Sequence, residues 1–170
     1  MRLIDRIWYQ VAKVLVRLFI LVCFCPKVEG AEYFRNISGA YIIYANHLSQ
    51  LDPVLLAWMN LPKRTSFFGK SELTRRRLTR WALTRLGLIP VVRGAADIGA
   101  VREAVHAIEQ GNVFAIFPEG TRNRELNGQL KRFQEGVAFI ALRTKVPVLP
   151  VELVSPEMRC LINPTGRFVL

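Results

Sequence analysis

Five short apolar runs have the length and composition of buried β-strands, at residues 41–45, 65–68, 88–92, 112–117 and 148–154. Segments with helical spacing separate them. These cover residues 53–60, a helix from Ser71 as N-cap to Gly87, a helix from Asp97 as N-cap to Gly111, and a helix around Gly136–Thr144. Alternating strands and helices predict an α/β fold with a central, mostly parallel β-sheet flanked by helices.

The most apolar segment, residues 2–25, precedes this pattern. Its polar members recur every three or four residues, so at ~100° per residue they share an arc of roughly 80° on a helix. They are Arg2, Arg6, Gln10, Lys13 and Arg17. A transmembrane helix would place Lys13 and Arg17 near mid-membrane, whereas an interfacial helix lets both reach the headgroups. We therefore expect residues 1–27 to form an amphipathic helix on the cytoplasmic face of a membrane, although packing on the domain would suit the same apolar face.

The remaining residues, 28–170, have no internal repeat or domain boundary and predict one domain. Residues 167–170 resemble the beginning of a strand with nothing after it. They indicate either a short edge strand or a chain truncated at its C-terminus.

Charge narrows the class of partner. The 170-residue chain carries a net charge of +11, which favours an anionic partner such as nucleic acid, a phosphorylated substrate or an anionic membrane. Residues 63–93 contribute nine cations and one acid, a net +8 that would attract a bilayer, CoA phosphates or an acidic carrier protein. Cys23, Cys25 and Cys160 have neither disulfide nor metal-site spacing, so we expect a reducing compartment and no metal.

A histidine and a carboxylate lie five positions apart in the turn after the first predicted strand, at His47 and Asp52. Neutral imidazole can take a proton from a hydroxyl, and a carboxylate on its other nitrogen would set the tautomer. The alternative is structural: residues 49–52 also match a capping box at the start of a helix. His106, in the middle of a predicted helix, is interpreted as an ordinary surface histidine.

Polar clusters follow three of the predicted strands. In open α/β sheets, ligands bind beyond the carboxyl ends of the strands, so these clusters predict one crevice. The two arginines suit a phosphate, Glu119 suits a polyol hydroxyl or an arginine, and Thr121 could add a hydroxyl contact. The clusters are Asn46 with His47, Arg93, and Glu119-Gly120-Thr121-Arg122.

These residues resemble the four ordered motifs of the 1-acylglycerol-3-phosphate O-acyltransferases, within the glycerolipid acyltransferase family. The likeness extends over roughly residues 28–154 in the right order. The matching segments are Asn46-His47 with Asp52, residues 87–93 (GLIPVVR), 117–122 (FPEGTR) and 146–151 (VPVLPV), with 68–73 (FGKSEL) between the first two.

The resemblance implies transfer of a fatty acyl group from an acyl-CoA or acyl-carrier-protein thioester to the hydroxyl of a lysophospholipid, with no further cofactor. The expected product is phosphatidic acid. His47 would be the general base and Asp52 its partner, without an acyl-enzyme. Asn46, Arg93, Glu119, Gly120, Thr121 and Arg122 would bind the acceptor, with Gly120 allowing close backbone approach.

Two other hypotheses remain. A related acyltransferase could use another lysophospholipid or an amino-acid lipid as acceptor. A non-catalytic basic module could bind an anionic membrane or nucleic acid, but nucleic-acid motifs and interleaved surface aromatics are missing, so no nucleic acid is expected. The chain has no Gly-rich Lys-Ser/Thr loop, which disfavours a P-loop NTPase.

Overall fold

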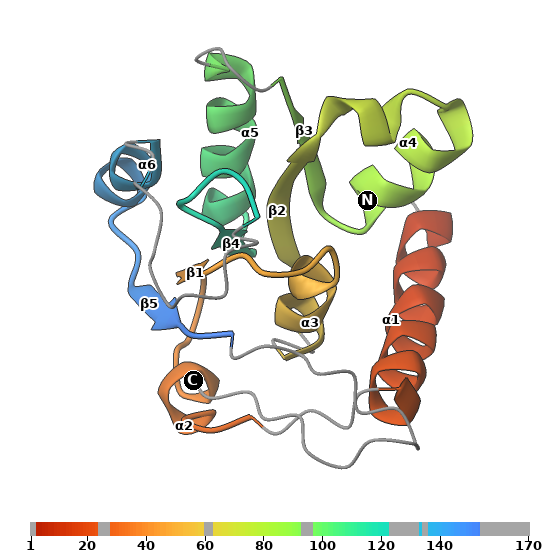
Figure 1. The fold of residues 1–170 in the computed structure, drawn as a ribbon, viewed down its shortest axis with the longest axis horizontal. Helices are drawn as coiled ribbons and strands as arrows, with labels where there is room; N and C mark the ends of the chain where they lie inside the picture. The colour runs from red at the N-terminus through yellow and green to blue at the C-terminus, as the bar shows by residue number, and fades with distance from the viewer. Residues whose placement is uncertain are drawn as a thin grey trace.

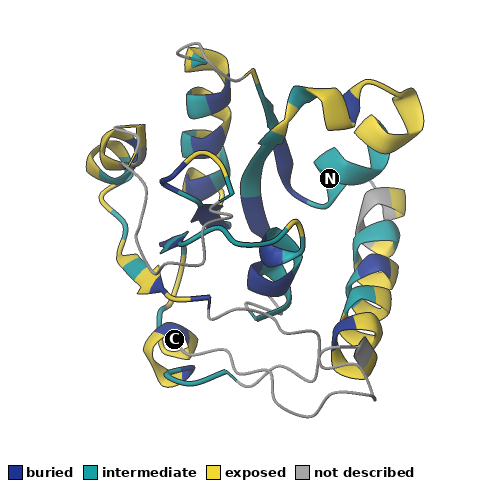
Figure 2. Ribbon diagram, in the orientation of Figure 1, coloured by how far each residue is buried: buried dark blue, intermediate teal, exposed yellow. Residues whose placement is uncertain are grey.

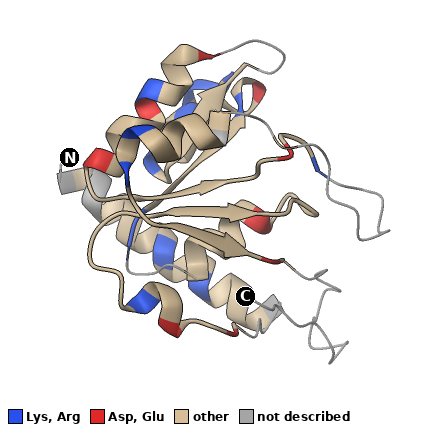
Figure 3. Cartoon of the chain, turned by 90° about the vertical axis from the view of Figure 1, so that its left-hand side faces the viewer, with Lys and Arg blue, Asp and Glu red and all other residues tan. Residues whose placement is uncertain are grey.

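The fold is built on a five-stranded β-sheet whose four strand pairings are all parallel. The computed structural model describes residues 3–23, 28–59, 63–92, 97–122, 133 and 136–153. The strand order is β3-β2-β4-β1-β5, and Figure 3 shows the strands between helices on either side. The strands are β1 (Ile42–Ala45), β2 (Thr65–Lys70), β3 (Leu88–Val91), β4 (Val113–Ile116) and β5 (Val148–Val151). The predicted α/β class and parallel sheet are confirmed.

Helices cover both faces of the sheet (Figure 1). Ile20 and Leu56, from two helices on one face, pack in one core with Ile43 of β1. Ile42 lies in the opposite core with Ile140, because successive strand residues point to opposite faces. The helices are α1 (Leu3–Cys23), α2 (Glu32–Arg35), α3 (Asp52–Met59), the 3₁₀-helix η1 (Ser71–Thr74), α4 (Arg77–Arg85), α5 (Ile98–Glu109) and α6 (Gly136–Thr144).

Most predicted elements differ from the observed ones only at their ends. Asp97 is the N-cap of α5, as predicted, and its carboxylate accepts a hydrogen bond from the Ala100 N–H at 2.9 Å. The short helix α2 lies in a segment for which no element was predicted. The predicted strand start at residues 167–170 lies outside the described residues.

The predicted helix from Ser71 to Gly87 is wrong as a single element, because the chain forms η1 and then α4. The Thr74 hydroxyl donates to the Ser71 carbonyl at 2.8 Å and so competes with the helical N–H for that acceptor. Arg76 then adopts an extended backbone, with φ −86° and ψ 138°, in a run of three adjacent arginines. Ser71 is not an N-cap: the residues preceding η1 and α4 are Lys70 and Arg76, and neither makes a side-chain cap.

Gly87 connects α4 to β3 in a conformation that requires glycine. Its φ is +102°, and a Cβ atom built there would lie 2.2 Å from the Thr65 carbonyl oxygen. The Gly87 carbonyl accepts the Phe67 N–H at 3.0 Å, at the start of the β2–β3 pairing. A side chain at position 87 would therefore push apart two neighbouring strands.

One side of α1 packs on the domain, so the domain-packing alternative for this helix is confirmed. Ala12 and Ile20 are buried, and Ile20 belongs to the core beneath α3. Trp8 packs against Trp81 of α4, with ring centroids 4.9 Å apart. Both contacts hold α1 at the margin of the domain, beside α3 and α4 (Figure 1).

A second apolar side of α1 is exposed (Figure 2). At ~100° per residue, most of these side chains fall on the side of the helix away from Ile20. None of the helices among the described residues is long and apolar enough to span a membrane. The exposed apolar side chains of α1 are Ile4, Ile7, Val11, Val14, Leu15, Leu18, Phe19, Leu21 and Val22.

Candidate active site

The turn after β1 holds the two residues predicted to be catalytic. His47 follows the end of β1, and Asp52 is the first residue of α3. The Nδ1 atom of His47 lies 2.8 Å from Oδ2 of Asp52. Their side chains are 14% and 1% exposed, so the carboxylate is buried while the imidazole reaches the surface. The expected contact between these two residues is confirmed.

Oδ2 of Asp52 also accepts hydrogen bonds from backbone N–H groups of the turn. The backbone N–H groups of Leu48 and Ser49 both donate to it at 2.7 Å. In a capping box, a side chain in the first turn of a helix accepts the backbone N–H of the residue three positions earlier, as Asp52 does with Ser49. The Ser49 hydroxyl oxygen in turn accepts the Leu51 N–H at 3.2 Å. The two interpretations do not exclude each other, because the oxygen that stabilises the start of α3 also contacts His47.

This arrangement determines which nitrogen of His47 can act as a base. An ionised carboxylate only accepts hydrogen bonds, so Nδ1 of His47 donates to Asp52. The lone pair of the neutral imidazole then lies on Nε2. A proton taken up there would leave an imidazolium that the buried Asp52 carboxylate stabilises.

An aromatic ring fixes the plane of the imidazole. The rings of Phe117 and His47 stack, with centroids 4.2 Å apart and planes inclined by 23°. Phe117 directly follows β4, the neighbour of β1 in the sheet. His47 is therefore held from two sides, by a carboxylate in the ring plane and by an aromatic face.

The loop after β4 contacts the same turn. Oε1 of Glu119 accepts the backbone N–H of His47 at 3.4 Å, and Glu119 is only 4% exposed. The loop turns sharply, because the Gly120 N–H donates to the Phe117 carbonyl at 3.0 Å and Gly120 has a φ of +65°. Glycine adopts this left-handed conformation at little cost. Two of the predicted strand-end clusters thus meet at one edge of the sheet.

The remaining predicted residues of these clusters are placed differently. Thr121 is exposed and Arg122 is half-buried in the loop after Gly120. Asn46 uses its carboxamide on the backbone after β5, since its Nδ2 donates to the Leu153 carbonyl at 2.8 Å and its Oδ1 accepts the Leu153 N–H at 2.7 Å. The observed contacts of Asn46 therefore give it a structural role in holding the His47 turn.

Arg93 lies outside the described residues, which resume at Asp97. The flanks of this gap are joined by one side chain, because Oδ2 of Asp97 accepts the Val92 N–H at 3.2 Å and Oδ1 accepts the Ala100 N–H. These backbone hydrogen bonds, first that of Ala100 and then that of Val92, hold the pKa of Asp97 below its ordinary value. Asp97 thus links Val92, at the end of β3, to the first turn of α5.

Phe117 and Leu153 were given no individual role by sequence reasoning. The position of Phe117, at the end of a buried run and next to Glu119, was an available signal for a contact with the site. Leu153 contributes only backbone atoms to Asn46, so its side chain gave no signal. Within the described ranges, no group of three or more His, Cys, Asp or Glu residues could hold a metal ion.

Comparison with known proteins identifies the family of the chain. A family profile described as Acyltransferase matches residues 25–154, which include the whole His47 turn and the loop after β4. This chain belongs to the acyltransferase family. The matched region also spans all five strands.

Several proteins named as acyltransferases are similar to this chain. A 1-acyl-sn-glycerol-3-phosphate acyltransferase from Cocos nucifera is 33% identical over 134 residues, which cover 77% of this chain and 42% of the relative. The protein of the same name from Streptococcus pneumoniae is 27% identical over 160 residues, covering 89% of this chain and 56% of the relative. The chloroplastic BAT2 protein of that name from Brassica napus is 27% identical over 158 residues, covering 92% and 44%. The chain thus spans about half the length of these relatives.

The fold also matches a solved structure. The crystal structure of the 1-acyl-sn-glycerophosphate (LPA) acyltransferase PlsC from Thermotoga maritima aligns with a TM-score of 0.65 and 24% identity. The alignment covers 95% of this chain and 67% of the Thermotoga maritima chain. The two proteins share the helix-flanked parallel sheet.

Proposed function

We propose that this acyltransferase moves a fatty acyl group from a thioester to the free hydroxyl of 1-acylglycerol-3-phosphate and so forms phosphatidic acid. The observation that carries the proposal is the His47–Asp52 pair, 2.8 Å apart at the carboxyl edge of the sheet. The names of the similar proteins supply the acceptor. The donor is an acyl-CoA or an acyl-carrier-protein thioester.

The proposed reaction has two steps and no covalent intermediate on the enzyme. Nε2 of His47 takes the proton from the acceptor hydroxyl while the oxygen attacks the thioester carbonyl carbon. The tetrahedral intermediate then collapses, the C–S bond breaks, and the thiolate takes the proton back from His47 as it leaves. Asp52 stabilises the imidazolium between the two steps, and Phe117 keeps the ring aligned.

The composition of the loop after β4 favours an acceptor that carries a phosphate. Arg122 lies on this loop. Arg93 directly follows Val92, whose backbone N–H donates to Asp97. We assign the acceptor phosphate to these two arginines, since guanidinium groups bind phosphates through paired hydrogen bonds. Thr121 and the backbone of Gly120 lie beside Arg122 and complete this part of the proposed site. Glu119 orients the His47 turn, and Asn46 supports it from β5.

The exposed apolar side of α1 favours a membrane surface as the source of the acceptor. A helix with large apolar side chains on one side and basic residues beside them lies in the headgroup region of an anionic bilayer. Arg17 is exposed at the edge of this apolar side and would contact the headgroups, whereas Lys13 lies on the domain side of the helix, half-buried near the Tyr9 ring. We therefore place the enzyme on the cytoplasmic face of a membrane with α1 in the interface.

Product analysis tests the proposal directly. Detergent-solubilised protein is incubated with radiolabelled acyl-CoA or acyl-carrier protein and a panel of lysolipid acceptors. Phosphatidic acid should form from 1-acylglycerol-3-phosphate, and His47→Ala should lower kcat by about a thousandfold. Arg122→Ala should mainly raise KM for the acceptor, whereas His106→Ala on the exposed side of α5 should match wild type. Equal activity of wild type and His47→Ala would contradict the proposed base.

A further inference from the structure

A cluster of exposed cations lies at the carboxyl end of β2, on η1 and α4. Other cations nearby are used structurally, since Arg64 donates to the Arg85 carbonyl at 2.9 Å and Lys63 donates to the carbonyls of Ile37 and Gly39. The exposed members have no ion-pair partner in the described part of the chain. We call them the basic ridge: Lys70, Arg75, Arg76, Arg77 and Arg80.

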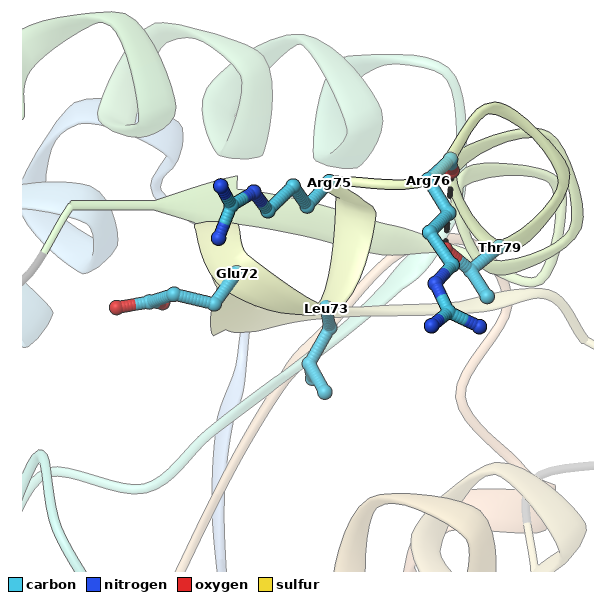
Figure 4. A pocket seen from close by; sticks show the side chains of 5 residues that line it. All are labelled: Glu72, Leu73, Arg75, Arg76 and Thr79. Carbon is cyan, nitrogen blue, oxygen red and sulfur yellow. Dashed lines mark hydrogen bonds between the residues drawn. The ribbon is translucent and has the colours of Figure 1, made fainter.

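The basic ridge carries exposed leucines among its cations. Leu73 is 51% exposed and Leu78 is 75% exposed, although both lie within three residues of an arginine. Figure 4 shows the groove between η1 and α4, where Leu73 and Arg76 point to one side while Arg75 extends in another direction. The Thr79 hydroxyl donates to the Arg76 carbonyl at 2.9 Å. The charged groups that line the groove are therefore two guanidinium groups and the exposed carboxylate of Glu72.

The position of the basic ridge connects it to the reaction. It follows β2, which pairs with β4, and β4 leads to Phe117 and the loop that contacts the His47 turn. All parallel strands end at one edge of the sheet, so the basic ridge and His47 lie at the same edge. The other margin of α4 contacts α1 through Trp8 and Trp81.

We infer that the basic ridge is the docking surface for a small acidic carrier protein that delivers the acyl thioester. This inference rests on the proposed function, because it assigns a place to the donor of that reaction. Cations mixed with exposed leucines complement a helix that presents carboxylates and a few apolar side chains. The nine residues of α4 extend about 13 Å and the four of η1 about 8 Å, which suits a protein surface.

Other anionic partners fit the basic ridge less well. CoA phosphates would be matched by a few neighbouring guanidinium groups and would leave Leu73 and Leu78 without a role. A flat bilayer would favour side chains directed to one plane, whereas Arg75 and Arg76 point in different directions (Figure 4). The experiment below distinguishes both of these partners from a carrier protein.

The test compares two donors with the same acyl chain, one on acyl-carrier protein and one on CoA. The variant is Arg75→Gln/Arg76→Gln, and the control is Arg102→Gln/Arg143→Gln, which removes two exposed arginines from α5 and α6. The basic-ridge variant should raise KM for the carrier-protein donor by roughly five- to tenfold, because rim charges mainly affect association. Its KM for acyl-CoA and both kcat values should stay within about twofold of wild type, as should all constants of the control.

Binding of acyl-carrier protein is titrated in parallel by fluorescence, independently of turnover. Saturable binding should weaken in the basic-ridge variant and in high salt. An equal rise in KM for both donors would assign the cations to CoA, and a loss of binding to anionic vesicles alone would assign them to the bilayer; either overturns the inference. Turnover of acyl-CoA with no affinity for the carrier protein would also overturn it and leave the proposed function intact. If no donor is used, the proposed function fails, and the titration still decides whether the basic ridge binds the carrier.

Discussion

Oδ2 of Asp52 accepts hydrogen bonds from the His47 ring at 2.8 Å and from two backbone N–H groups of the same turn. The turn and the imidazole are therefore positioned by one buried atom. The charge of that atom and its capacity to accept hydrogen bonds can be separated by substitution.

Asp52→Asn should remove the charge and keep an acceptor oxygen for the backbone N–H groups. We expect kcat to fall by about a hundredfold or more, because the imidazolium loses its counter-charge. The free energy of unfolding should change by less than about 2 kcal/mol. Steady-state kinetics and urea unfolding measure the two quantities. Asp52→Ala should lose stability as well as activity, and equal stability losses in both variants would contradict a separate catalytic role for the charge.

Phe117→Leu should weaken catalysis without affecting the affinity for the acceptor. Leucine remains apolar but cannot stack on His47, and an aromatic stack contributes about 0.5–1.5 kcal/mol, equivalent to roughly a two- to tenfold fall in kcat. KM for the acceptor should not change. Phe117→Tyr keeps the aromatic face and should restore most of kcat. A Tyr variant as slow as the Leu variant would argue against stacking as the cause.

Gly87→Ala should destabilise the protein by roughly 2–3 kcal/mol in urea unfolding, because it combines a strained φ with a clash. The new Cβ would lie 2.2 Å from the Thr65 carbonyl oxygen. Gly111→Ala is the matched control, since Gly111 has a φ of +85° and no atom within 4 Å of a Cβ. The control should cost only about 1 kcal/mol, the price of the conformation alone. Equal losses of stability in the two variants would show that the contact between the new Cβ and the Thr65 carbonyl adds nothing to the effect of the φ angle.

Lowering the pH should reduce the free energy of unfolding, partly because Asp97 becomes protonated. The pKa of this carboxyl is lowered by backbone hydrogen bonds in the folded state, so its contribution to stability is present above its unfolded pKa of about 4 and is lost as pH falls through the lower folded pKa. Asp97→Asn has no such titration. Wild type should therefore lose more stability than Asp97→Asn between about pH 5 and about pH 3 in urea unfolding. Glu103→Gln, on the exposed side of α5, should keep the pH dependence of wild type.

The parts of this architecture that depend on short-range patterns were predictable from the sequence. Alternating strands and helices predicted the parallel sheet, and a separation of five residues across a turn predicted the contact of His47 with Asp52. Asp97 was recognisable as an N-cap because capping depends on a few adjacent residues.

Contacts between distant segments were not predictable in the same way. The break at Arg76 follows a bond from the Thr74 hydroxyl to the Ser71 carbonyl, and the periodicity of apolar residues does not predict either feature. The packing of Trp8 on Trp81 joins two helices more than seventy positions apart, and apolar spacing alone did not show which side of α1 would contact the domain. Phe117 meets His47 only because β4 pairs with β1.

The hydrogen bonds between Asn46 and Leu153 connect residues 107 positions apart. During synthesis, the segment that contains His47 leaves the ribosome long before β5 exists to pair with β1. The N-terminal part of the chain can therefore collapse early, but the His47 turn gains these last supports only when Leu153 has emerged. Nascent chains should acquire the competent turn late, in one step with the closure of this edge of the sheet.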